Sequence, residues 1–144
     1  MIEQDTVRLL RECDAGAKMG IDAIKEVLDD VRDDRLRGLL HSSKREHEAL
    51  TGDIRARLNR FEDRGKDPSM MASAMSWMKT RAELMMKPGD RTVADLMTDG
   101  CNMGVKSLSR YLNQYKAADE QSKDCAKKLI AMEEKLTKDI QPYL

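Results

Sequence analysis

Apolar side chains recur at alternating steps of three and four along residues 7–31 and again along residues 36–61, which is the spacing of one buried face of an α-helix. Three members of these faces are polar: Asp14, Ser43 and His47. The pattern therefore predicts two long amphipathic helices. The faces comprise Val7, Leu10, Asp14, Ala17, Ile21, Ile24, Leu28 and Val31 in the first helix, and Leu36, Leu40, Ser43, His47, Leu50, Ile54, Leu58 and Phe61 in the second.

Breaks between the helices are marked by turn-forming and capping residues. In "VRDDRLRG" we expect Asp33 or Asp34 to be the N-cap of the second helix. The stretch "DRGKDPS" ends that helix, and "KPGD" ends a methionine-rich segment at 69–87, with Asp90 able to cap the next helix. The pattern predicts two further helices, at 92–115 and 119–141.

The second half of the chain repeats the first. Thr6-Val7 recurs as Thr92-Val93, "MGIDAIKEVL" as "MGVKSLSRYL", and "EALTGDIRARL" as "EKLTKDIQPYL". The first and last matches are 86 residues apart and the middle one 84, so the two copies differ slightly in length. We interpret the chain as a duplicated helical hairpin, and two such hairpins close most simply into a four-helix bundle.

The fold class predicted is therefore all-α. We expect residues 1–144 to form a single domain, with one hairpin at 5–63, a crossover helix at 69–87 and a second hairpin at 90–141. The crossover helix would be about 28 Å long, enough to carry the chain from one end of the bundle to the other.

The crossover segment holds six of the 11 methionines. Its predicted apolar face comprises Met71, Met75, Met78, Ala82 and Met85. Methionine adapts to irregular grooves, so packing against the bundle is the preferred interpretation. A copper(I) site and a membrane-surface helix are alternatives, but the first lacks an export signal and Glu83 interrupts the cations that the second requires.

A second apolar edge of that helix, including Trp77, favours contact with another protein or another copy of the chain. Met71, Met75, Trp77, Met78 and Met85 are the candidate interaction surface. We predict a homodimer, with a further protein partner possible at the methionine-rich helix.

Composition restricts the partners and the location. Lys plus Arg and Asp plus Glu both number 26, which argues against nucleic acid as a partner. Neither a signal peptide nor a long apolar span is visible, so we expect a cytoplasmic protein with no membrane partner. The three cysteines, Cys13, Cys101 and Cys125, form no C-x-x-C motif and are expected to be reduced thiols.

Polar residues on the inward faces are the candidates for chemistry. His47 and Glu133 lie 86 residues apart, so the repeat would place them opposite each other in the core. Asp14 is displaced by about 9 Å along the helix axis, which makes its contact with His47 less secure. We expect a buried His47–Glu133 pair that fixes helix register. The alternative is a single iron, manganese or zinc ion held by Asp14, His47 and Glu133.

Glycines at matching places suggest close helix approach. Met19-Gly20 recurs as Met103-Gly104, and glycine costs about 1 kcal/mol relative to alanine inside a helix. We expect Gly16, Gly20, Gly100 and Gly104 to serve packing rather than phosphate binding. His41 lies off the inward stripe and is expected to be solvated.

Two hairpins joined by a bundle-length crossover resemble the ferritin-like superfamily. The sequence "WMKTRAEL…GDRTVADLMTDGCNMGVKSLSRYLNQY" is also similar to sequences of a group of small bacterial ferritin-like proteins. The superfamily implies a dimetal site with a carboxylate from each of two helices and Glu-x-x-His from each of the other two. Here the pattern is broken, because Leu50 and Leu136 stand where the histidines are expected and His47 replaces one glutamate.

The resemblance implies that Asp14 would supply the carboxylate of the first helix, while Gly100 lies near the position in the third. A dimetal oxidase needs more ligands than these. We therefore expect a non-catalytic ferritin-like structural or protein-interaction module without a cofactor. The alternative is a metalloprotein with one residual site.

Overall fold

The computed structural model describes residues 2–68 and 79–144. Within them the chain is helical, with no strand, which confirms the all-α prediction. Residues 79–86 also form a helix, inside the segment predicted at 69–87. The remaining elements are α1 (Ile2–Leu28), α2 (Asp34–Asn59), α4 (Asp90–Gln114), α5 (Glu120–Ile140) and the 3₁₀ turn η1 (Gln141–Tyr143).

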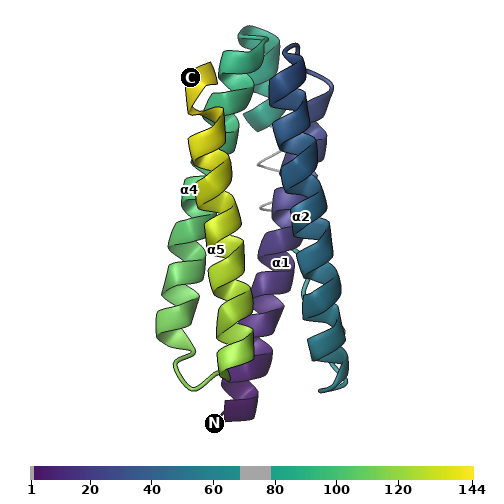
Figure 1. Cartoon of the computed structure of the whole chain (residues 1–144), viewed down its shortest axis with the longest axis vertical. Helices are drawn as coiled ribbons and strands as arrows, with labels where there is room; N and C mark the ends of the chain where they lie inside the picture. The colour runs from purple at the N-terminus through teal and green to yellow at the C-terminus, as the bar shows by residue number, and fades with distance from the viewer. Residues whose placement is uncertain (1, 69–78) are drawn as a thin grey trace.

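The four long helices lie side by side in an elongated bundle (Figure 1). α1 packs on α2, and α4 packs on α5, while α1 also contacts α4 and α5. α4 starts at the end of the bundle where α2 starts, so these two helices run in the same direction (Figure 1). The connection between them therefore travels from one end of the bundle to the other.

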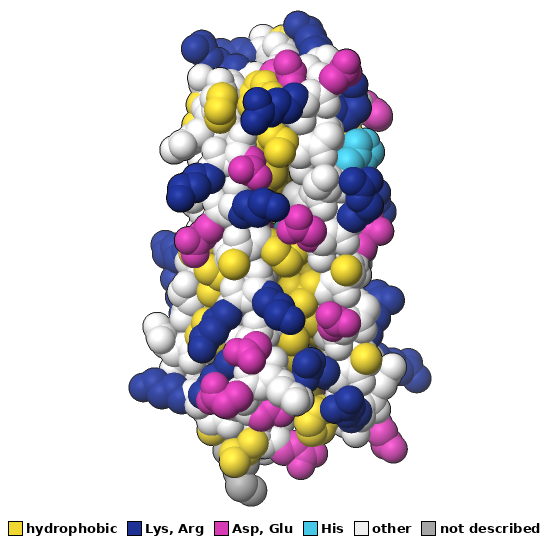
Figure 2. All heavy atoms as spheres, in the orientation of Figure 1, with side chains coloured by type: hydrophobic (Ala, Val, Ile, Leu, Met, Phe, Trp, Pro, Cys, Tyr) yellow, Lys and Arg dark blue, Asp and Glu magenta, His cyan; other side chains and the backbone are white. Residues whose placement is uncertain are grey.

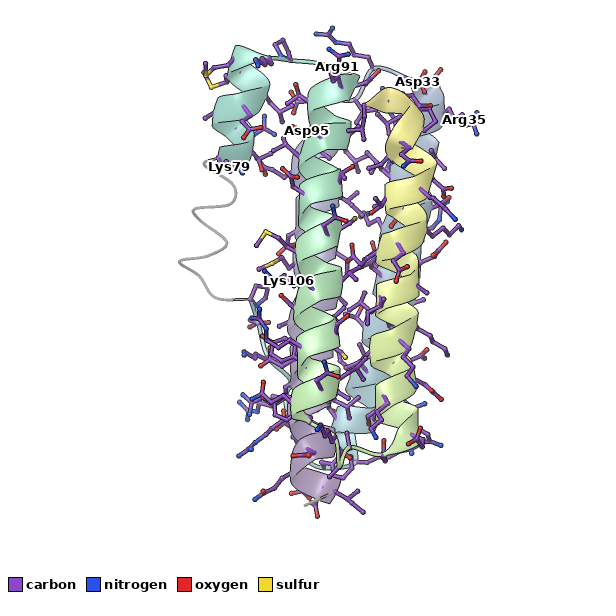
Figure 3. All side chains as sticks on the ribbon, turned by 90° about the vertical axis from the view of Figure 1, so that its left-hand side faces the viewer. Asp33, Arg35, Lys79, Arg91, Asp95 and Lys106 are labelled. Carbon is purple, nitrogen blue, oxygen red and sulfur yellow. The ribbon has the colours of Figure 1, made fainter. Side chains whose placement is uncertain are left out.

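Hydrogen bonds at both ends fix these directions. Asp90 Oδ1 and Oδ2 accept the backbone N–H groups of Arg32 and Asp33, at 2.8 and 3.1 Å. In Figure 3, Asp33 and Arg91 accordingly lie at the same end. At the opposite end, Thr6 Oγ1 accepts the N–H of Asp119 at 2.9 Å. Each turn is thus tied to the first part of a helix from the other half of the chain.

The helix caps agree in part with expectation. Asp33 is the N-cap of α2 and accepts the N–H of Leu36 at 2.9 Å, as predicted. The prediction that Asp90 caps α4 is wrong: the N-cap is Gly89, whose φ of 125° lies in a region that glycine favours. The carboxylate of Asp90 binds the α1–α2 turn instead of its own helix.

The core consists of two apolar clusters, one toward each end of the bundle. The N-end cluster, near the start of α1, comprises Leu9, Leu10, Cys13, Ala17, Leu50, Ile54, Leu58, Leu108, Ala118, Cys125, Ala126 and Leu129. The C-end cluster comprises Ile24, Val27, Val31, Leu36, Leu40, Leu84, Val93, Met97, Cys101, Leu136 and Ile140. Every long helix contributes to both clusters, so the boundary between them crosses the middle of the bundle.

The helix at 79–86 packs differently from the predicted methionine face. Leu84 is its buried side chain, whereas Ala82 is exposed and Met85 is 82% exposed. Arg81 holds this helix against α1 through Glu26 at 2.5 Å and Asp30 at 3.3 Å. Met85 is therefore not a packing residue, although it remains available as a contact surface. Figure 3 shows Lys79 beside the upper part of α4.

The other candidate contact residues, Met71, Met75, Trp77 and Met78, lie outside the described residues. The face of the molecule drawn in Figure 2 mixes charges of both signs, with apolar side chains between them along the long axis. Of the helices described, none is long and apolar enough to cross a membrane.

Candidate functional site

Between the two apolar clusters lies a polar layer, which we call the mid-bundle layer, made of Gly20, Ser43, His47, Gly104 and Glu133. His47 Nε2 on α2 lies 3.1 Å from Glu133 Oε1 on α5. The His47 side chain is 1% exposed and that of Glu133 is 9% exposed. The structure thus brings together the two residues that the repeat placed opposite each other.

Backbone groups of α2 hold the imidazole in place. His47 Nδ1 lies 2.7 Å from the carbonyl oxygen of Ser43, one turn earlier in the same helix. The hydroxyl of Ser43 is farther from Nδ1, at 3.4 Å. Both ring nitrogens are therefore engaged, one with the carbonyl and one with the carboxylate.

The pKa of His47 reflects two opposing effects. Burial lowers it, while the hydrogen bond and the negative charge of Glu133 raise it, with smaller contributions from the Ser43 carbonyl and from Glu46. The net result is a pKa above the ordinary value, because burial, the largest single effect, is outweighed by the stabilising contacts of the imidazolium taken together.

One glycine makes room for this pair, and a second lies at the matching place in the other half of the chain. A β-carbon on Gly20 of α1 would lie 2.9 Å from His47 Cδ2, a distance at which the ring would have to move. On the other side, a β-carbon on Gly104 of α4 would lie 3.6 Å from Glu133 Cδ, an ordinary contact. Gly20 is thus required for close approach, as predicted, and Gly104 lies at the matching place.

The prediction that glycine permits close helix approach is wrong for Gly100 and has little support at Gly16. A β-carbon on Gly100 would meet nothing within 4 Å, so no neighbour requires glycine there. At Gly16 the nearest neighbour is Leu129 at 3.6 Å, an ordinary contact. His41, expected to be solvated, is half-buried.

The Cys101 thiol lies near Glu133. Burial, together with the charge of Glu133 and a hydrogen bond to it, raises the pKa of Cys101. The thiol therefore stays protonated, which is the unreactive form of cysteine. The three cysteines are free, and all of them are buried.

Asp14 does not join the mid-bundle layer. Its Oδ2 lies 2.8 Å from Lys18 Nζ and accepts the backbone N–H of Lys66 at 3.0 Å. Lys18 in turn bonds Asp67, also at 2.8 Å, and Lys66 bonds Glu12 at 2.5 Å. Asp14 is fully buried, and it fixes the chain leaving α2 against α1.

A three-ligand metal site of Asp14, His47 and Glu133 is therefore not formed. In the ranges 2–68 and 79–144, no group of three or more His, Cys, Asp or Glu side chains is arranged to hold a metal ion. Both ring nitrogens of His47 and Oδ2 of Asp14 are occupied by neighbouring protein groups, while Asp14 Oδ1 is buried without a hydrogen-bond partner among the described residues. This arrangement can hold a proton between His47 and Glu133. Among the described residues, these contacts leave neither nitrogen of the His47 ring free to bind a metal ion.

The anchoring role of Asp14 was missed from the sequence, although one signal was present. Lys18 follows Asp14 by four residues, the spacing at which opposite charges meet on a helix. That pairing balances the charge of the carboxylate locally, through Oδ2, without a partner in the mid-bundle layer. The contact with Lys66 had no such signal, because it depends on the path of the chain after α2.

Polar interactions in the two halves of the chain correspond closely. Thr51 Oγ1 donates to the carbonyl of His47 at 3.0 Å, and Thr137 Oγ1 to that of Glu133 at 2.9 Å. The N-caps Asp33 and Asp119 each accept the N–H three residues on, at 2.9 and 2.8 Å. These matched pairs on α2 and α5 are all 86 residues apart.

On α1 and α4 the correspondence has a different offset. Thr6 and Asp90, which each accept the N–H of an N-cap aspartate from the other half, are 84 residues apart. Buried residues follow the same offset, since Leu9 and Cys13 match Val93 and Met97. The match of Thr6-Val7 with Thr92-Val93 is therefore shifted by two residues in the structure. The two extra residues of the second half lengthen the end of α4, because the helices of each half are joined by five residues, 29–33 and 115–119.

Comparison of the chain with protein family models, with curated proteins and with solved structures finds no match.

Proposed function

We propose that this chain is a non-catalytic, ferritin-like structural or protein-interaction module. One observation carries the proposal: the inward polar residues that could serve a metal bond protein groups instead, His47 with Glu133 and Asp14 with Lys18 and the Lys66 amide. His47 Nε2 faces Glu133 at 3.1 Å and His47 Nδ1 faces the Ser43 carbonyl at 2.7 Å, so the imidazole has no free nitrogen. With the central histidine paired in this way, we propose that the bundle acts through its shape and surface.

The ferritin-like part of the proposal rests on connectivity. α2 and α4 run in the same direction, so their connection has to cross the length of the bundle, as the long crossover of ferritin-like folds does (Figure 1). The matched caps, threonines and glycines of the two halves support an internal duplication. A duplicated hairpin accounts for the pairing of position 47 with position 133.

Metal content tests this proposal. The protein is purified without chelator or affinity tag and incubated with Fe(II), Mn(II) and Zn(II) before elemental analysis. We expect no stoichiometric metal in the native protein or in the His47→Ala variant, and no oxygen consumption with Fe(II). His41→Ala is the matched control, because His41 lies outside the mid-bundle layer.

Near-stoichiometric metal that is lost in His47→Ala but kept in His41→Ala would overturn the proposal. That result would restore the alternative of a residual iron, manganese or zinc site.

Self-association is the interaction we propose for this module, in the form of a homodimer. Met85 and Met86 are adjacent, 82% and 81% exposed, and lie at the end of the helix at 79–86. Large apolar side chains with this exposure are candidates for a contact between protein copies. The expected occupant of this surface is a second copy of the chain.

Light scattering at micromolar concentration tests the dimer. We expect twice the chain mass of 16.4 kDa for the native protein, and a shift toward the monomer for Met85→Lys/Met86→Lys. Met103→Lys on α4 is the control, since Met103 is 70% exposed but lies away from this surface. A monomeric native protein, or equal dimerisation of both variants, would contradict the proposed interface.

A further inference from the structure

The His47–Glu133 contact is a buried polar contact at the boundary between the N-end and C-end clusters. On each helix, the residue in the mid-bundle layer separates members of the two clusters. Glu133 stands between Leu129 and Leu136, and Gly20 between Ala17 and Ile24. A change in the His47–Glu133 contact therefore acts where the two clusters meet.

Hydrogen-bond chemistry fixes one proton on the ring. A carbonyl oxygen can only accept, so the 2.7 Å contact between Nδ1 and the Ser43 carbonyl requires a proton on Nδ1. In a neutral imidazole with that proton, Nε2 carries a lone pair. A second proton is therefore needed before Nε2 can donate.

The contact with Glu133 requires that second proton. An ionised carboxylate is acceptor-only, so a neutral Nε2 would place one lone pair against another at 3.1 Å. One proton between Nε2 and Oε1 turns this repulsion into a charge-assisted hydrogen bond. We infer that His47 and Glu133 form a proton-dependent latch, in which one shared proton joins α2 to α5 and its loss at raised pH separates the two helices at this layer.

None of the groups described below that surround the latch gains or loses a proton together with His47 near neutral pH. α1 and α4 face it with Gly20 and Gly104, and α4 also brings the Cys101 thiol close to Glu133. Glu46 on α2 adds negative charge but pairs with Lys135 of α5 at 3.5 Å. Burial and Glu133 raise the pKa of Cys101, so this thiol remains neutral while His47 titrates.

The direction of the effect follows from proton binding. The pKa of His47 in the folded protein lies above its ordinary 6.5. The folded state therefore holds a proton that the unfolded state releases as the pH rises past 6.5. The stabilisation is fully present below pH 6.5 and is lost as the pH rises through the folded pKa. This latch goes beyond the proposed structural role, which requires no response to pH.

Two measurements test the latch. The first is an NMR titration of the His47 ring nitrogens in the His41→Gln variant, in which one histidine remains. We expect His47 to titrate above 6.5, with Nδ1 protonated throughout. The second compares the unfolding of the native protein with that of His47→Leu/Glu133→Leu, which lacks the latch but not the helices. Across the titration window, we expect the native folding constant to fall relative to the variant by about tenfold per pH unit.

The repeat provides a sharper pair of variants. In His47→Glu/Glu133→His the two groups exchange places, and the carbonyl of Leu129 lies one turn before position 133, as that of Ser43 does before position 47. We expect the same loss of stability with rising pH. The single variant His47→Glu places two carboxylates together, so its stability should also fall with rising pH, but in a window that starts at the ordinary pKa of glutamate, about 4.3, and not at that of histidine.

The latch is overturned if His47 titrates at or below 6.5, or if the native protein and His47→Leu/Glu133→Leu differ by a constant amount from pH 6 to pH 10. If a leucine variant does not fold, the titration of His47 decides alone. Repeating the titration with excess chelator separates this outcome from a failure of the proposed function. A bound metal would suppress the titration until the chelator removes it, whereas the latch is unaffected.

Discussion

The two halves of the chain correspond in many of their polar contacts, but in the mid-bundle layer α2 carries His47 where α5 carries Glu133. N-cap aspartates, threonines bonded to their own helix and closely packed glycines all correspond. In two identical halves, positions 47 and 133 would face each other with the same side chain. The difference allows an acid to meet a base, which is the favourable arrangement for two ionisable groups in a core.

A second difference separates α1 from α4. Asp14 binds Lys18 and the backbone of Lys66, while Thr98, the residue 84 positions later, has a buried hydroxyl with no partner among the described residues. In the first half, the chain that leaves α2 is held against α1, because Asp14 accepts the backbone N–H of Lys66. In the second half, α5 is followed by the turn η1, which contacts α4 and α5.

The largest effect is expected from removing one member of the central pair. His47→Leu leaves the Glu133 carboxylate buried without its partner, and we expect a loss of about 3–5 kcal/mol in unfolding free energy at pH 6. Urea denaturation measures this loss.

The control is His47→Leu/Glu133→Leu, in which both polar groups are replaced. We expect this double variant to be as stable as the native protein or more so, because well-packed apolar residues often replace a buried ion pair without cost. Equal losses in the single and double variants would mean that packing, and not charge, accounts for the effect.

Asp14→Ala should have the next largest effect. It removes the acceptor for Lys18 and for the Lys66 amide, and we expect a loss of about 2–3 kcal/mol. Hydrogen exchange at the Lys66 amide should accelerate as well. Thr98→Val is the matched control and should gain about 1 kcal/mol, because it removes a buried hydroxyl without a partner among the described residues. If both variants lose stability alike, Asp14 has no anchoring role.

Gly20→Ala tests the close contact between α1 and the imidazole. The added β-carbon would lie 2.9 Å from the ring, so we expect a loss of about 1–2 kcal/mol by thermal or urea unfolding. Gly100→Ala should instead gain about 1 kcal/mol, because alanine favours the helix and nothing obstructs it. Opposite signs in these two variants distinguish steric fit from helix propensity.

The smallest effect is expected at an N-cap. Asp119→Ala should lose about 1 kcal/mol, since it removes the acceptor for the N–H of Ser122. Calorimetry would detect this as a modest fall in Tm. Asp33→Ala should lower Tm further, because Asp33 also accepts the hydroxyl of Tyr143 at 2.9 Å. A smaller fall for Asp33→Ala would show that the Tyr143 contact adds nothing.

The Asp33 comparison also has a pH dependence. The hydrogen bonds from Leu36 and Tyr143 lower the pKa of Asp33. Its stabilisation is therefore present above the pKa of an unfolded aspartate and is lost as the pH falls through the lower folded value. The difference in Tm between the native protein and Asp33→Ala should shrink in acid.

The helices, the Asp33 cap and the facing of His47 and Glu133 could be predicted because each depends on local spacing or on the repeat. Apolar residues at steps of three and four indicate which face is buried, and an 86-residue offset relates positions across the bundle. These signals do not require knowledge of how the connecting segments travel.

The contact of Asp90 with the α1–α2 turn and that of Asp14 with Lys66 depend on where turns and connections lie in space. No local sequence pattern predicts such contacts. Exposure of Met85 was missed for a related reason. Methionine at helical spacing predicts a buried face, but Leu84 fills that place, and the contact of Arg81 with Glu26 and Asp30 fixes the helix in this orientation.

The three buried thiols can also be used to measure how often the core opens, because a thiol reacts only when it becomes exposed. Cys13 and Cys125 lie in the N-end cluster and Cys101 in the C-end cluster. Burial, followed by nearby negative charges, raises the pKa of Cys13 to about 12, so it reacts slowly while the cluster is closed. In variants that keep a single cysteine, the rate of alkylation would record how often each end of the bundle exposes its core.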